Sequence, residues 1–139
     1  MPGKFCPVPL RQLLKLILKE LGDNGTIFGI PRELFFIPEQ NQAIRTEIFG
    51  HSLHSPVGVA AGPHTQMAQN IVAAWLTGAR YIELKTVQVL DELDVSKPCI
   101  DMQDEGYNCE WSQELKIRKS FAEYLNAWII IHILNRRLG

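Results

Sequence analysis

The first regular pattern of apolar and polar positions lies in the stretch LRQLLKLILKEL, residues 10–21. Its apolar side chains recur every three or four residues, at positions 10, 13, 14, 17, 18 and 21. This spacing places them on one side of an α-helix. Pro9 suits the first turn because proline lacks the N–H that a helix leaves unbonded there. Gly22 is typical of a helix end, so we predict an amphipathic helix over residues 10–21.

A turn-rich connection follows this helix and contains one short apolar piece, Leu34–Ile37. The next pattern is TEIFGHSLHSP, in which Thr46–Phe49 and His51–Leu53 form two short extended arms around Gly50. Short β-prone arms separated by glycine are typical of a hairpin. We therefore predict a small antiparallel hairpin over residues 46–53.

From residue 56 the pattern changes to an alternation of strand and helix. The small apolar run PVGVAAG predicts a strand that ends at Gly62, and ARYIELKTV predicts a second strand. Between them, PHTQMAQNIVAAWLTG predicts a helix with Thr65 as the cap and Gly78 at its end. Its apolar stripe consists of Met67, Ala68, Ile71, Val72, Trp75 and Leu76. A strand, a helix and a strand in so few residues indicate two parallel strands joined by a right-handed crossover.

The last part of the chain holds a long polar connection, residues 88–110, and then a helix predicted over Ser120–Leu138. One side of this helix carries Phe121, Tyr124, Leu125, Trp128 and His132. We expect Trp128 to serve packing, as Trp75 and Trp111 do, and His132 to be partly buried.

Composition narrows the class of protein. The chain has 139 residues, 46% hydrophobic and 21% charged, with a formal net charge of -1. These values are typical of one globular unit and offer no electrostatic reason to expect a nucleic-acid partner. The apolar run Trp128–Leu134 is shorter than the ~20 residues that a membrane span needs, so we expect no membrane span.

The cysteines indicate the compartment. Cys6, Cys99 and Cys109 are an odd number and form no C-x-x-C pair. A disulfide framework is therefore not expected, and a reducing cytoplasm is the predicted location. The spacing also lacks the closely spaced ligand runs of zinc or iron–sulfur sites, so we expect no metal in this chain.

Candidate chemistry lies where the two predicted parallel strands end, because ligands bind beyond the carboxyl ends of such strands. Ala60, Ala61 and Gly62 leave the first strand almost without side chains, and Lys85 ends the second. Bare backbone N–H and C=O groups beside a fixed cation suit a planar, electron-accepting ring such as a flavin.

Other interpretations of these residues remain open. Glu83 stands two residues before Lys85, on the same side of the strand, and the two side chains can form a structural ion pair. A buried lysine can also act as a Schiff-base nucleophile in a phosphate-binding barrel. His64 is more often a capping or loop histidine than a catalytic one.

Three stretches carry a family resemblance: GVAAGPHTQMAQNIVAAW, GARYIELKTVQ and KPCIDMQDEGYNCEWSQEL. They resemble the amino-terminal part of the selenate reductase subunit family, large flavin and iron–sulfur proteins related to the flavin barrel of dihydroorotate and dihydropyrimidine dehydrogenases. The resemblance implies an α/β fold, a partial (β/α)8 TIM barrel with an N-terminal helix and hairpin. Residues 1–45 would form a helical extension, and residues 46–139 the first part of the flavin-binding barrel.

The resemblance also implies roles for particular residues. Ala60, Ala61 and Gly62 match the loop that lies against FMN, Lys85 matches the lysine that contacts the ring, and Thr86 is its neighbour. The iron–sulfur clusters of the parent protein, with FAD as a further candidate cofactor, belong to regions absent here. The catalytic acid–base residue and the phosphate-binding loops also belong to later barrel strands.

Asn108, in YNCEWSQEL, resembles the asparagine that holds the substrate in dihydropyrimidine dehydrogenases. An amide can donate to and accept from a pyrimidine-like edge at once. The chain departs from those enzymes at Pro98-Cys99, where they commonly have proline followed by arginine, and this puts a pyrimidine substrate in doubt.

The expected function is therefore that of the amino-terminal part of an FMN-dependent oxidoreductase, which passes electrons between a small-molecule substrate and other electron-transfer domains or subunits. A complete barrel takes about 250 residues, so this chain alone is expected to be inactive and to bind FMN weakly or not at all. The alternative is a truncated, non-catalytic fragment that acts at most in assembly. An open sheet edge also predicts self-association into a homo-oligomer.

Overall fold

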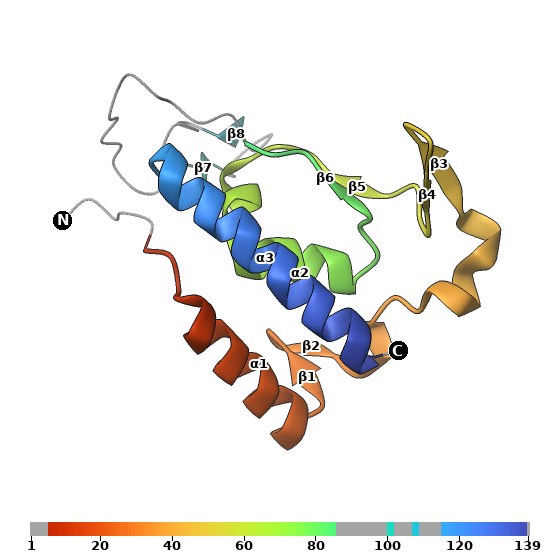
Figure 1. Cartoon of the computed structure of the whole chain (residues 1–139), viewed down its shortest axis with the longest axis horizontal. Helices are drawn as coiled ribbons and strands as arrows, with labels where there is room; N and C mark the ends of the chain where they lie inside the picture. The colour runs from red at the N-terminus through yellow and green to blue at the C-terminus, as the bar shows by residue number, and fades with distance from the viewer. Residues whose placement is uncertain (1–5, 86–99, 102–106, 109–114, 139) are drawn as a thin grey trace.

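The computed structural model describes residues 6–85, 100–101, 107–108 and 115–138 (Figure 1). Its α-helices are α1 (Leu10–Asp23), α2 (Ala68–Leu76) and α3 (Ile117–Leu138). Its strands are β1 (Thr26–Ile27), β2 (Ile30–Pro31), β3 (Thr46–Ile48), β4 (His51–Leu53), β5 (Gly58–Val59), β6 (Tyr81–Ile82), β7 (Ile100–Asp101) and β8 (Tyr107–Asn108). Short 3₁₀ helices cover η1 (Arg32–Leu34), η2 (Pro38–Ile44) and η3 (Pro63–Gln66).

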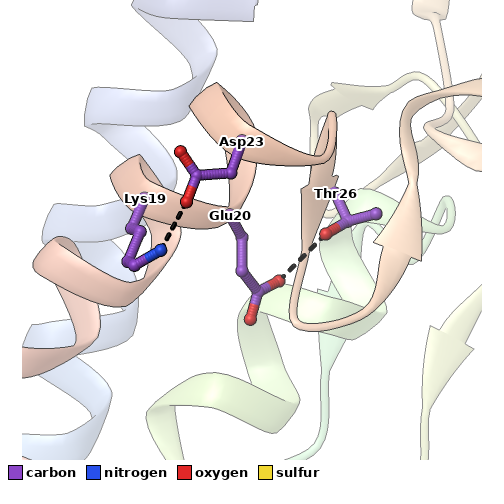
Figure 2. A network of polar contacts seen from close by, with 4 residues as sticks. All are labelled: Lys19, Glu20, Asp23 and Thr26. Atoms are coloured by element: carbon purple, nitrogen blue, oxygen red, sulfur yellow. Dashed lines mark hydrogen bonds and ion pairs between the residues drawn. The ribbon is translucent and has the colours of Figure 1, made fainter.

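The predicted first helix is confirmed as α1, but it continues through Gly22 and ends at Asp23. Leu13 and Ile17 are its buried residues, and Leu10, Leu14 and Leu21 are partly buried against the same core, whereas Leu18 is exposed. The end of α1 is held to the β1–β2 hairpin by Glu20, whose carboxylate accepts hydrogen bonds from the Thr26 hydroxyl at 3.2 Å and from the Gly29 N–H at 3.0 Å. Figure 2 shows the Thr26 contact and the neighbouring Lys19–Asp23 ion pair on the exposed side of the helix.

The predicted hairpin is confirmed as β3 and β4, with Glu47 opposite Ser52. Phe49 and Gly50 form the two-residue turn, and their φ angles of 52° and 77° are both positive. Turns of this kind match the right-handed twist of the flanking strands. Gly50 accepts such a conformation at no steric cost, which is why the sequence signal was reliable here.

The predicted strand–helix–strand unit is also confirmed. β5 and β6 are parallel, with Gly58 opposite Tyr81 and Val59 opposite Ile82. A Cβ atom at position 58 would lie 2.0 Å from Cε2 of Tyr81, so the ring of Tyr81 lies directly over this glycine. α2 connects the two strands, and its predicted stripe is buried at Met67, Ala68, Ile71, Val72 and Leu76, with Trp75 half-buried.

The start of α2 differs from the prediction of one helix capped by Thr65. Residues 63–66 form η3, and Met67 is extended before α2 begins at Ala68. Thr65 therefore caps η3. The first N–H of α2 instead donates to Oε2 of Glu123 at 2.8 Å, a carboxylate supplied by α3.

The expectations that Trp128 serves packing and that His132 is partly buried were wrong. Trp128 is 60% exposed and His132 is exposed, and their rings meet at a tilt of 58° with centroids 4.2 Å apart. Phe121 is 66% exposed, whereas Tyr124 is partly buried against the core. The buried side consists of Ser120, Glu123, Ala127, Ile130 and Leu134. The smaller and aliphatic side chains on that face allow α3 to pack closely across α2 (Figure 1).

One hydrophobic core joins the three α-helices and β1. Its buried residues come from α1, β1, α2 and α3: Leu13, Ile17, Ile27, Ala68, Ile71, Val72, Leu76, Ala127, Ile130 and Leu134. The first helix thus shares its core with the strand–helix–strand unit. Within the described residues the parallel pair β5–β6 is not part of a closed barrel, and the other strand pairs are antiparallel.

Candidate functional site

The candidate site lies at the carboxyl ends of β5 and β6. Val59 pairs with Ile82 in parallel, so Gly62 and Lys85 each stand three residues beyond the last paired residue of their strand. The N–H of Glu83 donates to the carbonyl of Val59 at 2.9 Å, which keeps the two chains together past the strands. The fold therefore brings the small-residue loop and the lysine to the same edge of the sheet.

Glu83 has a definite role at this edge. Its Oε2 accepts a hydrogen bond from the N–H of Ala61 at 3.1 Å. The carboxylate therefore fastens the loop after β5 to the end of β6. The unusual acidic residue near the end of the second strand is explained by this contact with the neighbouring loop.

The loop closes on itself at its other end. The N–H of Gly62 donates to Oγ1 of Thr65 at 3.2 Å, and the Thr65 hydroxyl donates to the carbonyl of Gly62 at 2.9 Å. The N–H groups of Ala61 and Gly62 are thus bonded within the protein. Their hydrogen-bond acceptors are the side chains of Glu83 and Thr65, respectively.

The surface of the loop is nonetheless small and open. Ala60 and Ala61 are exposed, whereas Gly62 is buried. A Cβ atom on Gly62 would lie 2.6 Å from Cε1 of His64, so the imidazole lies directly over this glycine. His64 is itself exposed, and its carbonyl accepts a hydrogen bond from Asn70 Nδ2 at 3.1 Å. These contacts are those of a loop histidine.

Lys85 is only 6% exposed. A charged amine is buried in a protein only where polar or charged groups replace the lost water. The position of Lys85 at the end of β6 gives the site a basic side chain held by the protein interior.

Gln66 is a candidate site residue that the sequence analysis missed. It follows the small-residue loop, is 0% exposed, and accepts a hydrogen bond from the N–H of Leu115 at 3.4 Å through Oε1. Its Nε2 is buried and has no partner among the described residues. Buried donors are rarely left unbonded, so this amide is available to a bound group. A glutamine at the start of a predicted helix gives no sequence signal of that kind.

Two further predicted site residues, Thr86 and Asn108, lie wholly or partly outside the described part of the chain. Thr86 lies outside the described residues. Asn108 lies in β8, where its backbone pairs with Ile100, but its side chain lies outside what the structure describes. Cys6 is exposed and free, and the two other cysteines lie outside the described residues.

Two general findings concern the described part of the chain. It contains no group of three or more histidine, cysteine, aspartate or glutamate residues placed to hold a metal ion. Within the same part, every helix is too short or too polar to cross a membrane.

The parallel strands, the connecting helix and the loops at the strand ends define an α/β protein whose candidate site lies at the carboxyl edge of the sheet. The model of the family "Oxidoreductase YgfK, N-terminal TIM-barrel domain" matches residues 28–139. The chain belongs to this family.

Two Escherichia coli proteins, from strain K12 and from O157:H7, carry the name "Putative oxidoreductase YgfK". Each is 51% identical to this chain over 128 residues, which covers 92% of the chain but 12% of the relative. The chain thus spans about an eighth of the length of these relatives. No solved structure gives a significant match. The matches support the predicted oxidoreductase family and the TIM-barrel domain.

Proposed function

We propose that this chain forms the first part of a flavin-binding barrel in a longer oxidoreductase, with FMN lying against residues 60–62 beside Lys85. The observation that carries the proposal is the parallel register of β5 and β6. It brings a floor of small residues and a buried lysine to one edge of the sheet.

The described residues fit a flat ring in two respects. The exposed methyl groups of Ala60 and Ala61 allow a planar group to lie close to the loop. The buried Lys85, at the same edge of the sheet, would supply a side-chain donor beside it. The amides of Ala61 and Gly62 do not contribute, so binding here would rest on face contact and on side-chain donors.

In this arrangement each residue has a defined task. Lys85 would donate to the pyrimidine edge of the ring and favour negative charge there. Glu83 and Thr65 would hold the loop in shape through their bonds to Ala61 and Gly62. A bound flavin would supply the electron-accepting chemistry, which no side chain can provide.

The activity of the whole protein follows as part of the proposal. It would pass electrons between a small-molecule substrate and iron–sulfur or second-flavin domains, in the cytoplasm, with Asn108 contacting the substrate. The oxidoreductase name of the E. coli relatives supports this reaction class. Selenate as the substrate rests on the family resemblance alone.

A non-catalytic role in assembly is the second candidate. The two-stranded sheet β5–β6 and the exposed side of α3 at Phe121 and Trp128 favour it, because both are surfaces suited to further protein contacts.

Replacing the matched segment of an E. coli relative by this chain provides the test. The chimera would be purified with Lys85 or with Lys85→Met, and the flavin released on denaturation would be quantified. Loss of a hydrogen bond from a charged donor weakens binding by about tenfold or more. We therefore expect the Lys85→Met chimera to contain much less FMN, and Lys15→Met, an exposed change on α1, to contain the normal amount.

Two results would contradict the proposal. An unsubstituted chimera that folds without flavin would favour the assembly role. Equal flavin content and equal rates of flavin reduction in the unsubstituted chimera and its Lys85→Met variant would leave the flavin in place but remove Lys85 from the site.

A further inference from the structure

A pocket lies at the end of the β5–α2–β6 unit opposite to the candidate site. Its volume is about 210 Å³. The lining residues come from η1 and the segment after it, from the ends of α2 and α3, and from the loops before β5 and β6: Arg32, Phe35, Phe36, Ile37, Pro38, His54, Trp75, Leu76, Arg80, Asn135 and Leu138. The N–H of Arg80 donates to the carbonyl of Val57 at 2.9 Å, which places the pocket at the amino ends of the strands, away from Lys85.

Arg80 is the central polar residue of this pocket. Its guanidinium lies over the ring of Phe36, 4.5 Å from the centroid, and 5.5 Å from the centroid of Trp75. Its Nη1 donates to the carbonyls of Trp75 at 2.8 Å and Ala79 at 2.9 Å. Capping of the α2 end accounts for Nη1, but Nε and Nη2 make no such bonds among the described residues.

The ionisable side chains that line the pocket are all basic. Arg32, Arg80 and His54 contribute basic groups, and none of the described residues that line it is acidic. Glu33 and Glu39 stand in the neighbouring segments but do not line the pocket. Burial lowers the pKa of Arg80 by desolvation, and an anion in the pocket would offset that cost.

The walls restrict the shape of such an anion. Phe35, Phe36 and Trp75 present aromatic surface, on which a planar ring packs well. The volume is below the roughly 300–1,000 Å³ of pockets that hold drug-sized ligands, so one ring is the appropriate size. A guanidinium pairs with a carboxylate through two parallel hydrogen bonds.

We propose that this pocket binds a small aromatic carboxylate, with the ring among the aromatic side chains that line the pocket and the carboxylate at Arg80 and Arg32. The site is independent of the flavin proposal, because it lies at the other end of the strands and shares no residue with the loop at 60–62.

Isothermal titration calorimetry of the 139-residue protein with benzoate tests the proposal, and benzamide serves as a neutral ligand of the same shape. Removal of a charge-assisted hydrogen bond changes affinity by about tenfold. We expect saturable benzoate binding at one site, at least about tenfold tighter than benzamide. Acetate and inorganic phosphate should bind more weakly than benzoate because they lack the ring.

Substitutions of the two arginines test whether benzoate binds in this pocket. Arg80→Gln should weaken benzoate binding about tenfold and Arg32→Gln, at an exposed residue, by about threefold. Arg11→Gln, an exposed change on α1, is the matched control and should leave the affinity unchanged. If circular dichroism shows that Arg80→Gln does not fold, Arg32→Gln and the benzoate–benzamide comparison still decide the matter.

Several results would overturn the proposal: equal affinities for benzoate and benzamide, benzoate heat that does not saturate, or an affinity that Arg32→Gln leaves unchanged. Phosphate or acetate binding as tightly as benzoate would show a simple anion site and refute the aromatic part of the proposal.

Discussion

At the carboxyl ends of β5 and β6, small residues and bonded backbone face solvent, whereas at the amino ends aromatic rings and Arg80 surround the end of α2. Both ends depend on hydrogen bonds from side chains to backbone. Glu83 and Thr65 bond the loop at one end, and Arg80 bonds the carbonyl of Trp75 in the last turn of α2 at the other. The difference lies in the side chains at each end, which are small at 60–62 and include the aromatic rings of Phe36 and Trp75 beside Arg80.

The two ends of α2 also differ in the charge of the side chain that holds them. Its first N–H bonds the carboxylate of Glu123, and the carbonyl of Trp75 near its last turn bonds the guanidinium of Arg80. An anion at the start of a helix and a cation at its end both favour the helix dipole. The helix is therefore held by a side chain at each end.

The largest expected effect comes from the start of α2. Glu123→Ala removes a carboxylate that is 2% exposed and leaves the N–H of Ala68 buried without a partner. We expect the free energy of unfolding to fall by about 2–3 kcal/mol. Urea unfolding measures it, with the exposed Glu47→Ala as a control that stays within about 0.5 kcal/mol. A loss as small as that of the control would show that Glu123 does not hold α2.

A glycine at each end sharpens the comparison. Gly78 has φ +112°, and a Cβ there would lie 3.1 Å from Cδ2 of Phe36. Gly78→Ala should therefore cost about 1–3 kcal/mol of stability. Gly62 is extended, with φ −172°, and a new Cβ meets only the imidazole of exposed His64. Gly62→Ala should cost less than about 1 kcal/mol.

The same urea experiment compares the two alanine variants. Combining Gly62→Ala with His64→Ala should recover the stability lost at position 62, because the smaller side chain removes the clash. A larger loss of stability for Gly62→Ala than for Gly78→Ala would contradict this comparison. It would mean that the backbone is more tightly constrained at the carboxyl ends of β5 and β6 than at their amino ends.

The smallest expected effect concerns Tyr124 on α3. Its hydroxyl oxygen is buried without a partner among the described residues, and desolvation raises the pKa of the phenol. Tyr124→Phe removes the unpaired group, so stability at neutral pH should be unchanged or higher by up to about 1 kcal/mol.

The raised pKa of Tyr124 also predicts how the stability of the protein changes with pH. In the unfolded chain tyrosine loses its proton near pH 10, whereas the folded protein holds it to higher pH. Stability therefore falls as the pH rises above about 10, and the Phe variant should lose less. Thermal unfolding at neutral and at alkaline pH measures the difference, with Tyr81→Phe at a more exposed site as the control. An identical alkaline loss in Tyr124→Phe would contradict this account.

Short-range signals in the sequence predicted much of the fold. Gly50 predicted the turn of the β3–β4 hairpin, and the apolar stripe of α2 predicted the burial of Ile71 and Leu76. The spacing of the two apolar runs predicted the parallel strands β5 and β6. The meeting of residues 60–62 and Lys85 at one edge of the sheet was also predicted from the two parallel strands. Parallel strands of known register place their ends together, whatever else the chain does.

Side-chain partners from distant parts of the chain could not be predicted in this way. Glu123 and Ala68 are 55 residues apart, and Gln66 and Leu115 are 49 residues apart. α3 has apolar residues on more than one side, so its pattern did not reveal that Ala127 and Ile130 pack inward. Which side is buried depends on how closely α2 can approach, and this follows from the size of the side chains on both helices.

The sequence by itself thus determined the local elements and the edge at which the loop of residues 60–62 and Lys85 meet, because turns and periodic burial act over a few residues. Only the tertiary structure decided that Glu83 bonds the loop, that Glu123 caps α2 and that aromatic rings enclose Arg80. Those contacts join segments whose proximity arises when the helices pack into one core.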